Sequence, residues 1–151
     1  MLLVGDTNVF FTYFWENSST KELLTIHKLI VPKLSLIEIN KYESSILSKT
    51  GISGSMFSEL KQELAKLVDF IPKKEYINSL KEMESYIKSL DLSEHDEQEM
   101  FDDIDFLSLA LKLNCPLWSN DKLLKKQSKV DVLNTREVIE LTVFTSVLFS
   151  R

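Results

Sequence analysis

The sequence is poor in cysteine, glycine, proline and histidine, and each shortage excludes something. A single cysteine, Cys115, rules out an intrachain disulfide and a cysteine-based zinc site. Three glycines and three prolines argue against a long linker or a turn-rich all-β fold. Only two histidines are present, His27 and His95, so a histidine-rich metal site is excluded as well. Any metal site would have to be built from oxygen ligands.

The sequence also lacks a long apolar run and an excess of basic residues. The apolar stretch 138–149 is interrupted by polar residues and is too short to span a bilayer, and residues 1–5 carry no basic region typical of a signal peptide. We therefore expect a cytoplasmic protein without membrane contact. With 18 basic and 23 acidic residues the formal net charge is −5, which disfavours broad nonspecific contact with nucleic acid.

What the sequence does contain is typical of one folded domain spanning residues 1–151, with 44% hydrophobic and 27% charged residues. Short apolar runs alternate with helical patterns. Strands are expected at 2–5, 29–31, 68–71, 116–119 and 130–133, and helices at about 7–15, 20–28, 32–48, 55–66, 75–90, 104–113, 122–127 and from 135 onward. The acidic segment 93–99 fits either a loop or the start of a solvated helix. This alternation predicts a three-layer α/β/α sandwich with a central, mainly parallel sheet of four to five strands.

Two acids stand where such a fold binds ligands. Parallel sheets place ligand sites beyond the carboxyl ends of their strands, and Asp6 and Asp121 each follow a predicted strand. Two carboxylates about 4 Å apart repel by roughly 4 kcal/mol at an effective dielectric constant near 20, so a cluster of acids needs a proton or a cation. Oxygen ligands suit Mg²⁺ or Mn²⁺. One or two such ions would favour phosphodiester hydrolysis, because they activate water and stabilise charge on a phosphoryl oxygen.

Each acid also has a simpler explanation. Asp6 and Asp121 could cap the helices that follow them. Glu38 could be a surface residue of an amphipathic helix. A cluster near position 103 lies in the expected first turn of a helix, where the helix dipole favours negative charge. Its members are Asp102, Asp103 and Asp105. Taken singly, these acids do not decide between a structural and a catalytic role.

Four segments, in order along the chain, resemble motifs of the PIN-domain family. The first is Asp6–Phe10 after an apolar strand, and the second is Val31–Ile39, a strand followed by proline and an acid on the next helix. The third is Asp103–Leu111, an acid opening an Ala/Leu-rich helix, and the fourth is Asn114–Asp121, a strand ending in serine shortly before an acid. Residues 132–141 resemble the end of the family's domain, so the resemblance covers essentially the whole chain.

The resemblance implies an endoribonuclease that uses Mg²⁺ or Mn²⁺, often the toxin of a bacterial or archaeal toxin–antitoxin pair. It further implies an RNA substrate, a possible antitoxin protein as partner, and a homodimer. The acids that match the family's catalytic metal ligands are Asp6, Glu38, Asp103 and Asp121, and the supporting polar residues beside them are Asn8 and Ser119.

The third acid requires a choice between two neighbours. In the family pattern the acid stands seven residues before an alanine of the helix, here Ala110, which selects Asp103. Asp105 is the alternative, and it would point to a different side of the helix.

Lysines beside the matched acids are the candidates for RNA contact. Lys122, Lys125 and Lys126 follow Asp121 directly, and Lys41 stands three residues after Glu38. A solvated helix face explains the first three equally well.

An aromatic run near the N-terminus is attributed first to the core and second to a protein interface. Its members are Phe10, Phe11, Tyr13, Phe14 and Trp15. A second function from another class is a noncatalytic PIN-like module that binds RNA or protein, although the presence of all four acids favours catalysis. An aspartyl-phosphate phosphatase would need an acid at Asn8, and a phosphoacceptor receiver domain would need an acidic pair before the first helix.

Overall fold

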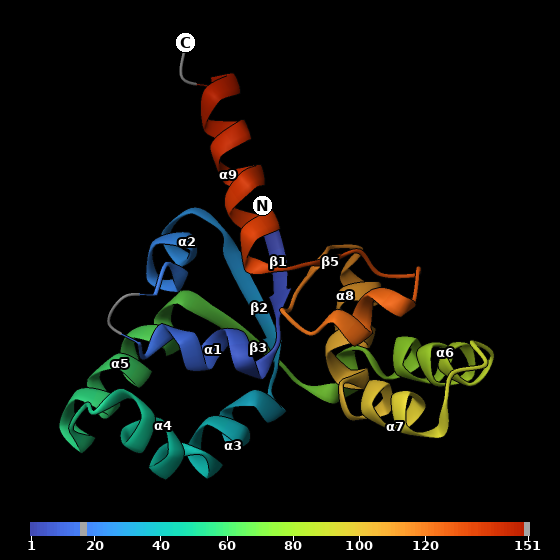
Figure 1. Ribbon diagram of the computed structural model, residues 1–151, viewed down its shortest axis with the longest axis horizontal. Helices are drawn as coiled ribbons and strands as arrows, with labels where there is room; N and C mark the ends of the chain where they lie inside the picture. The colour runs from blue at the N-terminus through green and yellow to red at the C-terminus, as the bar shows by residue number, and fades with distance from the viewer. Residues whose placement is uncertain (16–17, 150–151) are drawn as a thin grey trace.

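A five-stranded sheet stands at the centre of the computed structural model, which describes residues 1–15 and 18–149 (Figure 1). The strand order is β3-β2-β1-β4-β5, and every pair of neighbours runs parallel. The strands are β1 (Leu2–Gly5), β2 (Lys28–Pro32), β3 (Val68–Ile71), β4 (Leu117–Trp118) and β5 (Val132–Leu133). The expected α/β/α sandwich with a parallel sheet is confirmed.

Helices connect the strands and cover both faces of the sheet. In chain order the α-helices are α1 (Thr7–Tyr13), α2 (Thr20–Ile26), α3 (Leu34–Lys41), α4 (Glu43–Thr50), α5 (Gly54–Leu67), α6 (Ile77–Lys88), α7 (Glu94–Asp102), α8 (Ile104–Leu113) and α9 (Thr135–Phe149). Two short 3₁₀ helices complete the set, η1 (Lys73–Glu75) and η2 (Lys122–Lys126).

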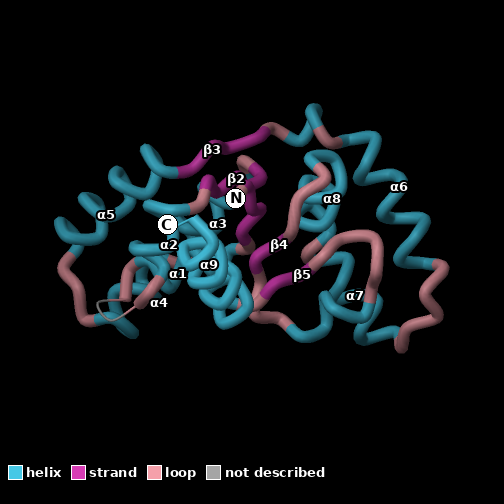
Figure 2. Tube along the Cα trace, turned by 90° about the horizontal axis from the view of Figure 1, so that it is seen from above, coloured by secondary structure: helices cyan, strands magenta, loops and turns pink. Residues whose placement is uncertain are grey.

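The strands send alternate side chains to opposite faces, and this alternation builds two apolar clusters. Leu3 and Leu29 pack with residues of α1, α2, α4 and α5 on one face. Val4 and Ile30, one position further along the same strands, pack with α6, α7 and α8 on the other. Figure 2, seen from above, shows the sheet as the middle layer between these two groups of helices.

The helix expected over 32–48 is in fact two helices. Pro32 belongs to β2, where it pairs with Ile71, and α3 ends before Tyr42, whose backbone (φ −99°, ψ 13°) is not helical. Ile39 and Ile46, on either side of this bend, are both buried in the same apolar cluster. The bend at Tyr42 therefore accompanies the burial of both isoleucines in one core, which replaces the single straight helix that the sequence suggested.

Other helices and strands differ in type or length from those expected from the sequence. The acidic segment is helical: Ser93 caps α7 by accepting a hydrogen bond from the Asp96 N–H (3.2 Å), and the acids in the first turn suit the helix dipole. The expected basic helix is the 3₁₀ helix η2, and the expected strand 130–133 is shortened to β5. Gly51 ends α4 in the left-handed conformation (φ 72°), which glycine adopts readily.

Most of the N-terminal aromatic run is core. Phe10, Tyr13 and Phe14 are buried, and Phe14 stacks on Phe57 with 4.9 Å between the ring centroids. Trp15, by contrast, is 47% exposed. Core packing therefore explains the run up to Phe14 and leaves Trp15 unexplained.

The last helix, α9, projects from the body of the molecule (Figure 1). Val138 and Thr142 are buried against the body, while Ile139, Val143 and Phe144 are exposed. Across residues 1–15 and 18–149, no helix combines the length and apolar character needed to cross a bilayer.

Candidate functional site

A cleft of about 380 Å³ lies at the carboxyl end of the sheet, where β1 and β4 run side by side. Asp6 follows β1 directly, and its N–H donates to the Trp118 carbonyl at the end of β4 (3.2 Å). The chain leaves β1 for β2 on one side and has β4 on the other, which is the reversal of strand order that opens such crevices.

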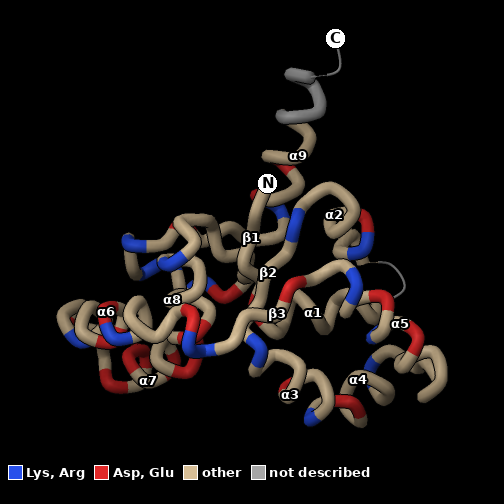
Figure 3. Tube along the Cα trace, turned by 180° about the vertical axis from the view of Figure 1, so that it is seen from behind, with Lys and Arg blue, Asp and Glu red and all other residues tan. Residues whose placement is uncertain are grey.

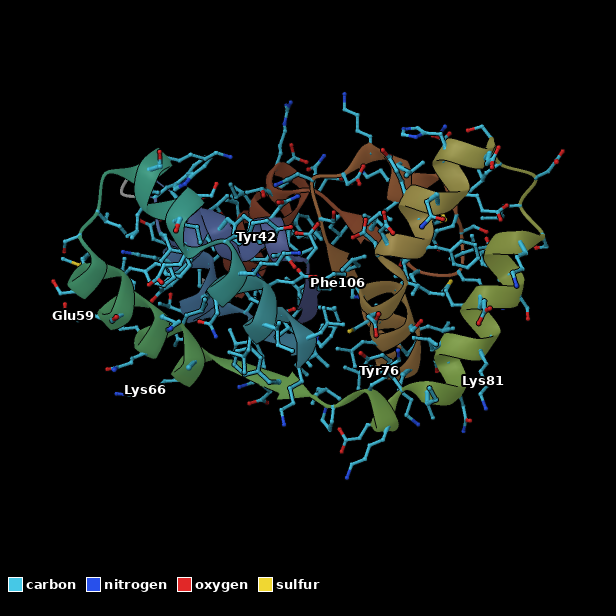
Figure 4. All side chains as sticks on the ribbon, turned by 90° about the horizontal axis from the view of Figure 1, so that it is seen from below. Tyr42, Glu59, Lys66, Tyr76, Lys81 and Phe106 are labelled. Atoms are coloured by element: carbon cyan, nitrogen blue, oxygen red, sulfur yellow. The ribbon has the colours of Figure 1, made fainter. Side chains whose placement is uncertain are left out.

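Four acids from separate parts of the chain line this cleft. Asp6 comes from the end of β1, Glu38 from α3, Asp103 from the junction of α7 and α8, and Asp121 from the segment after β4. The structure thus brings together all four acids that match the family motifs. Figure 4 looks at the molecule from below and labels Tyr42 and Phe106, which line the cleft from opposite helical layers.

Asp6 and Asp121 both cap helices. One carboxylate oxygen of Asp6 accepts a hydrogen bond from the Val9 N–H (2.9 Å), and one of Asp121 accepts from the Leu123 N–H (3.0 Å). Ser119 lies near both acids, because its hydroxyl oxygen accepts from the Asp121 N–H (3.1 Å) and its hydroxyl is close enough to lower the pKa of Asp6. The capping explanation is correct for both acids, and it leaves each with a second oxygen at the cleft.

Glu38 is held next to Asp6 by a single hydroxyl. The Thr7 hydroxyl donates a short hydrogen bond to one carboxylate oxygen of Glu38. Since Thr7 is the first residue of α1 and follows Asp6 directly, this bond joins the start of α1 to α3. Glu38 therefore faces the cleft and is only partly exposed, rather than lying on a solvated helix face.

Asp103 and Asp6 are the acids whose protonation the cleft changes most. Burial raises the pKa of Asp6; the Ser119 hydroxyl and the Val9 N–H oppose this shift, and the charge of Asp121 adds to it. Burial, together with the charges of Asp6, Asp121, Asp102 and Glu38, raises the pKa of Asp103 to about 7. No side-chain hydrogen bond caps α8 at Asp103. A carboxylate in this position gains most from a neutralising cation.

Asp105, the alternative third acid, is turned away from the cleft. It accepts a hydrogen bond from the Tyr76 hydroxyl (2.7 Å), and it does not line the cleft. Burial, followed by this hydrogen bond and the Asp105 charge, raises the pKa of Tyr76. The structure therefore groups Asp103, and not Asp105, with the other three acids. It also corrects the placement of Asp102, which ends α7 instead of opening the next helix.

The residues at the cleft fit a hydrated hard cation. Its lining carries carboxylates, hydroxyls and an amide, and neither histidine belongs to it: His27 bonds to the N-terminal amine and Thr142, and His95 pairs with Glu99. In the part of the chain that the structure describes, no three Asp, Glu, His or Cys side chains are close enough to hold one ion directly. Mg²⁺ keeps several waters and often takes only one or two carboxylates, so such an ion would be held partly through water.

The lysines predicted to contact RNA do not line the cleft. Lys126 pairs with Asp96 (2.7 Å), and Lys125 pairs with Glu137. Lys41 lies over the Tyr42 ring, 5.5 Å from its centroid, and Lys122 is exposed on η2. Two of the four are therefore occupied in ion pairs with acids of α7 and α9.

Lys49, on α4, is the lysine that does line the cleft, and sequence reasoning missed it. Tyr42, Ser45 and Lys49 share the spacing of one helix face. That spacing would have pointed to Lys49 had the bend at Tyr42 been known. Asn8, by contrast, was expected beside the acids and does line the cleft.

Comparison with known proteins adds two findings. The sequence matches the family model described as PIN domain over residues 4–141. The fold is similar to a chain in the crystal structure of VapBC2 from Rickettsia felis bound to a DNA fragment from their promoter: the TM-score is 0.64, the sequence identity 16%, and the match covers 89% of this chain and 98% of that one. No curated protein matches significantly.

Proposed function

The chain belongs to the PIN-domain family, and from this premise we propose that it is an endoribonuclease that hydrolyses RNA phosphodiester bonds with Mg²⁺ or Mn²⁺. The observation that carries the proposal is the convergence of Asp6, Glu38, Asp103 and Asp121 on one cleft at the carboxyl end of a parallel sheet. Acids gathered in this way destabilise a fold unless a cation is bound, and the family's chemistry supplies a use for one.

In this proposal each cleft residue has a stated task. The four carboxylates hold the cation through oxygen atoms, directly or through water, and a bound divalent ion would lower the pKa of a water and stabilise charge on a phosphoryl oxygen. The Ser119 hydroxyl keeps Asp121 in place by accepting from its backbone N–H, and the Val9 N–H holds the Asp6 carboxylate. Asn8, exposed at the cleft, can donate amide hydrogen bonds to a phosphate.

We extend the proposal to partners. A toxin of this family would act in the cytoplasm, bind an antitoxin protein and form a homodimer. The exposed apolar residues Ile139, Val143 and Phe144 on α9 offer a surface for such contacts. Light scattering of the purified chain, alone and with the product of the adjacent gene, tests both contacts; a monomer in each case would refute them.

The experiment that tests the activity is RNA cleavage with added Mn²⁺ or Mg²⁺. Asp6→Asn should reduce the rate by at least about 100-fold without unfolding the protein, because it removes a charge that holds the ion. The matched control is Asp102→Asn, since Asp102 stands beside Asp103 but is exposed and bonds to Gln98 (3.1 Å). Cleavage that survives excess chelator, or that Asp6→Asn leaves intact, would contradict the proposal.

A noncatalytic RNA- or protein-binding module is the second candidate. The observation in its favour is the spacing of the acids. Among the described residues, no three Asp, Glu, His or Cys side chains are close enough together to bind one metal ion directly. Calorimetric titration with Mn²⁺ separates the two. RNA binding without any Mn²⁺ binding would support the module and refute the nuclease.

A further inference from the structure

A continuous groove leads away from the acidic cleft along α1. Next to the cleft lies a hollow of about 250 Å³, which shares Asn8, Phe11 and Lys49 with it. Beyond lies a third hollow of about 530 Å³, which shares Thr12, Trp15 and Lys49 with the second. Because successive hollows share lining residues of α1, together they follow this helix. In Figure 1, α1 lies between α2 above it and α4 below it.

The floor of the groove is one face of α1 and its continuation. Asn8, Phe11, Thr12 and Trp15 stand at positions i, i+3, i+4 and i+7, the spacing of residues on one side of a helix. At a rise of about 1.5 Å per residue, Trp15 lies about 10 Å from Asn8 along the axis. The groove thus has an acidic end that fits a cation and an aromatic end beyond it.

Trp15 has the properties of a stacking platform. The chain has two tryptophans, of which Trp118 is fully buried whereas Trp15 is 47% exposed. The Trp15 ring is about half exposed and lines two of the three hollows, so it is accessible to a ligand in the groove. A flat apolar ring beside polar groups suits an unstacked nucleic-acid base.

Lys49 is the cation of the groove. It lines all three hollows, it is exposed, and none of the ion pairs in the described part of the chain involves it. Lys125 and Lys126, by contrast, already pair with acids. Of these lysines, Lys49 is therefore the one placed to contact a phosphate in the groove.

Most residues that line the far hollow carry a hydroxyl group. Thr12, Ser18, Thr20, Thr50 and Thr135 line it. The Thr12 and Thr20 hydroxyls bond to each other (2.6 Å), and the Ser18 hydroxyl donates to Thr20 (2.9 Å), which orders this wall. Hydroxyls donate and accept hydrogen bonds, so they match phosphate oxygens and ribose 2′-hydroxyls.

From these observations we infer that the groove along α1 binds a single-stranded segment of RNA, with a base stacked on Trp15 and a phosphate contacted by Lys49. The inference rests on the proposed ribonuclease function and deepens it, since it names the form of the substrate and the residues that hold it away from the cleft. A duplex does not fit, because its bases are stacked on one another and closed to Trp15. An apolar peptide helix would suit the mostly apolar second hollow, but it would leave the acids of the cleft and the hydroxyls of the far hollow without polar partners.

The test measures binding without cleavage. A fluorescent single-stranded oligoribonucleotide of about ten nucleotides is titrated with the protein in excess chelator, so that the result is independent of the nuclease proposal. Trp15→Ala should weaken binding by about tenfold or more, the size of the loss of one stacked base. Lys49→Gln should weaken it by a few fold and flatten the slope of log affinity against log salt by about 0.7. The control is Lys66→Gln, an exposed lysine on α5 outside the groove (labelled in Figure 4).

The wild-type chain supplies a second readout. Because Trp118 is buried, bound RNA should quench mainly the fluorescence of Trp15, and Trp15→Phe should lose the quenching while keeping most of the affinity. Three results would overturn the inference. Trp15→Ala could bind RNA as tightly as the wild type, or the wild type could bind a duplex of the same sequence equally well. The groove variants could also weaken binding to a partner protein and leave RNA affinity unchanged. If the groove variants lose RNA binding but the wild type never cleaves RNA, the groove stands and the nuclease proposal fails.

Discussion

Two regions of this protein gather acids, and they differ in what stands opposite the carboxylates. On α7 and its neighbours, acids meet lysines of the segment 122–129: Asp96 pairs with Lys126 (2.7 Å), and Glu82 pairs with Lys129 (2.9 Å). Figure 3 shows how densely acids gather on α7. In the cleft at the end of the sheet, none of the ion pairs of the described residues involves Asp6, Glu38, Asp103 or Asp121.

The pKa values of the two regions move in opposite directions. The hydrogen bond from Lys126 lowers the pKa of Asp96, and that from Lys125 lowers the pKa of Glu137. Burial raises the pKa of Asp6 and of Asp103, and neighbouring acids add to the rise. The negative charge of a carboxylate is therefore stabilised where a lysine pairs with it and destabilised in the cleft. Carboxylates whose charged form is destabilised in a cleft are typical of a ligand-binding site, whereas carboxylates already paired with lysines on a surface require no ligand.

The largest effect that would sharpen this contrast is the response to metal. If the cleft binds metal as proposed, Mn²⁺ at about 100 times its Kd should stabilise the wild type by about 2.7 kcal/mol, because the ion would bind the folded protein alone. For a chain of this size the melting temperature should rise by roughly 5–11 °C. Glu38→Gln should remove most of this rise, and Asp96→Asn, at the paired surface, should keep it. Calorimetric melts with metal or chelator measure both; equal responses of the two variants would erase the distinction.

A smaller effect concerns pH in the absence of metal. Asp103 has a pKa of about 7 in the folded state, whereas its ordinary pKa is 3.8, so between these values the folded state binds more protons than the unfolded state. Its contribution to stability therefore becomes unfavourable as pH rises from about 4 to about 7 and stays so above. Asp103→Asn should match the wild type near pH 4 and exceed its stability at pH 8 by about 1–2 kcal/mol, allowing for partial solvent screening.

Urea denaturation across this pH range in chelator checks the Asp103 prediction. The control variant is Asp131→Asn, because Asp131 is exposed and far from the cleft lining. Its difference from the wild type should not change with pH. If the difference in unfolding free energy between Asp103→Asn and the wild type were also independent of pH, the charged form of Asp103 would not be destabilised in the folded protein.

Much of the fold could be predicted from local pattern. Short apolar runs marked the strands, and Asp6 and Asp121 could be placed at strand ends because the runs stop just before them. The resemblance to the PIN-domain family, through the spacing to Ala110, selected Asp103 over Asp105, and the structure groups Asp103 with the other acids. The metal-binding role of these acids remains a prediction.

What local pattern could not predict depends on contacts between distant segments. Lys126 is paired with Asp96, which lies 30 positions away, so its lysine cluster looked free when the sequence alone was considered. The bend at Tyr42 turns Lys49 toward the cleft, yet the apolar spacing on both sides fits one continuous helix. In both cases the deciding partner lies in another element of the fold.

The smallest effect is expected from disrupting the ion pair between Asp96 of α7 and Lys126 of η2. Lys126→Gln removes the partner of Asp96, but both side chains are solvated, so the melting temperature should fall by no more than about 2 °C and by less in high salt. RNA cleavage should stay within about twofold of the wild type, because this lysine is held by an acid and does not line the cleft. Steady-state cleavage rates and melts of the same preparation test both statements. A large loss of cleavage with an unchanged melting temperature would show that Lys126 leaves its acid for RNA, and the surface of η2 would then belong to the substrate site after all.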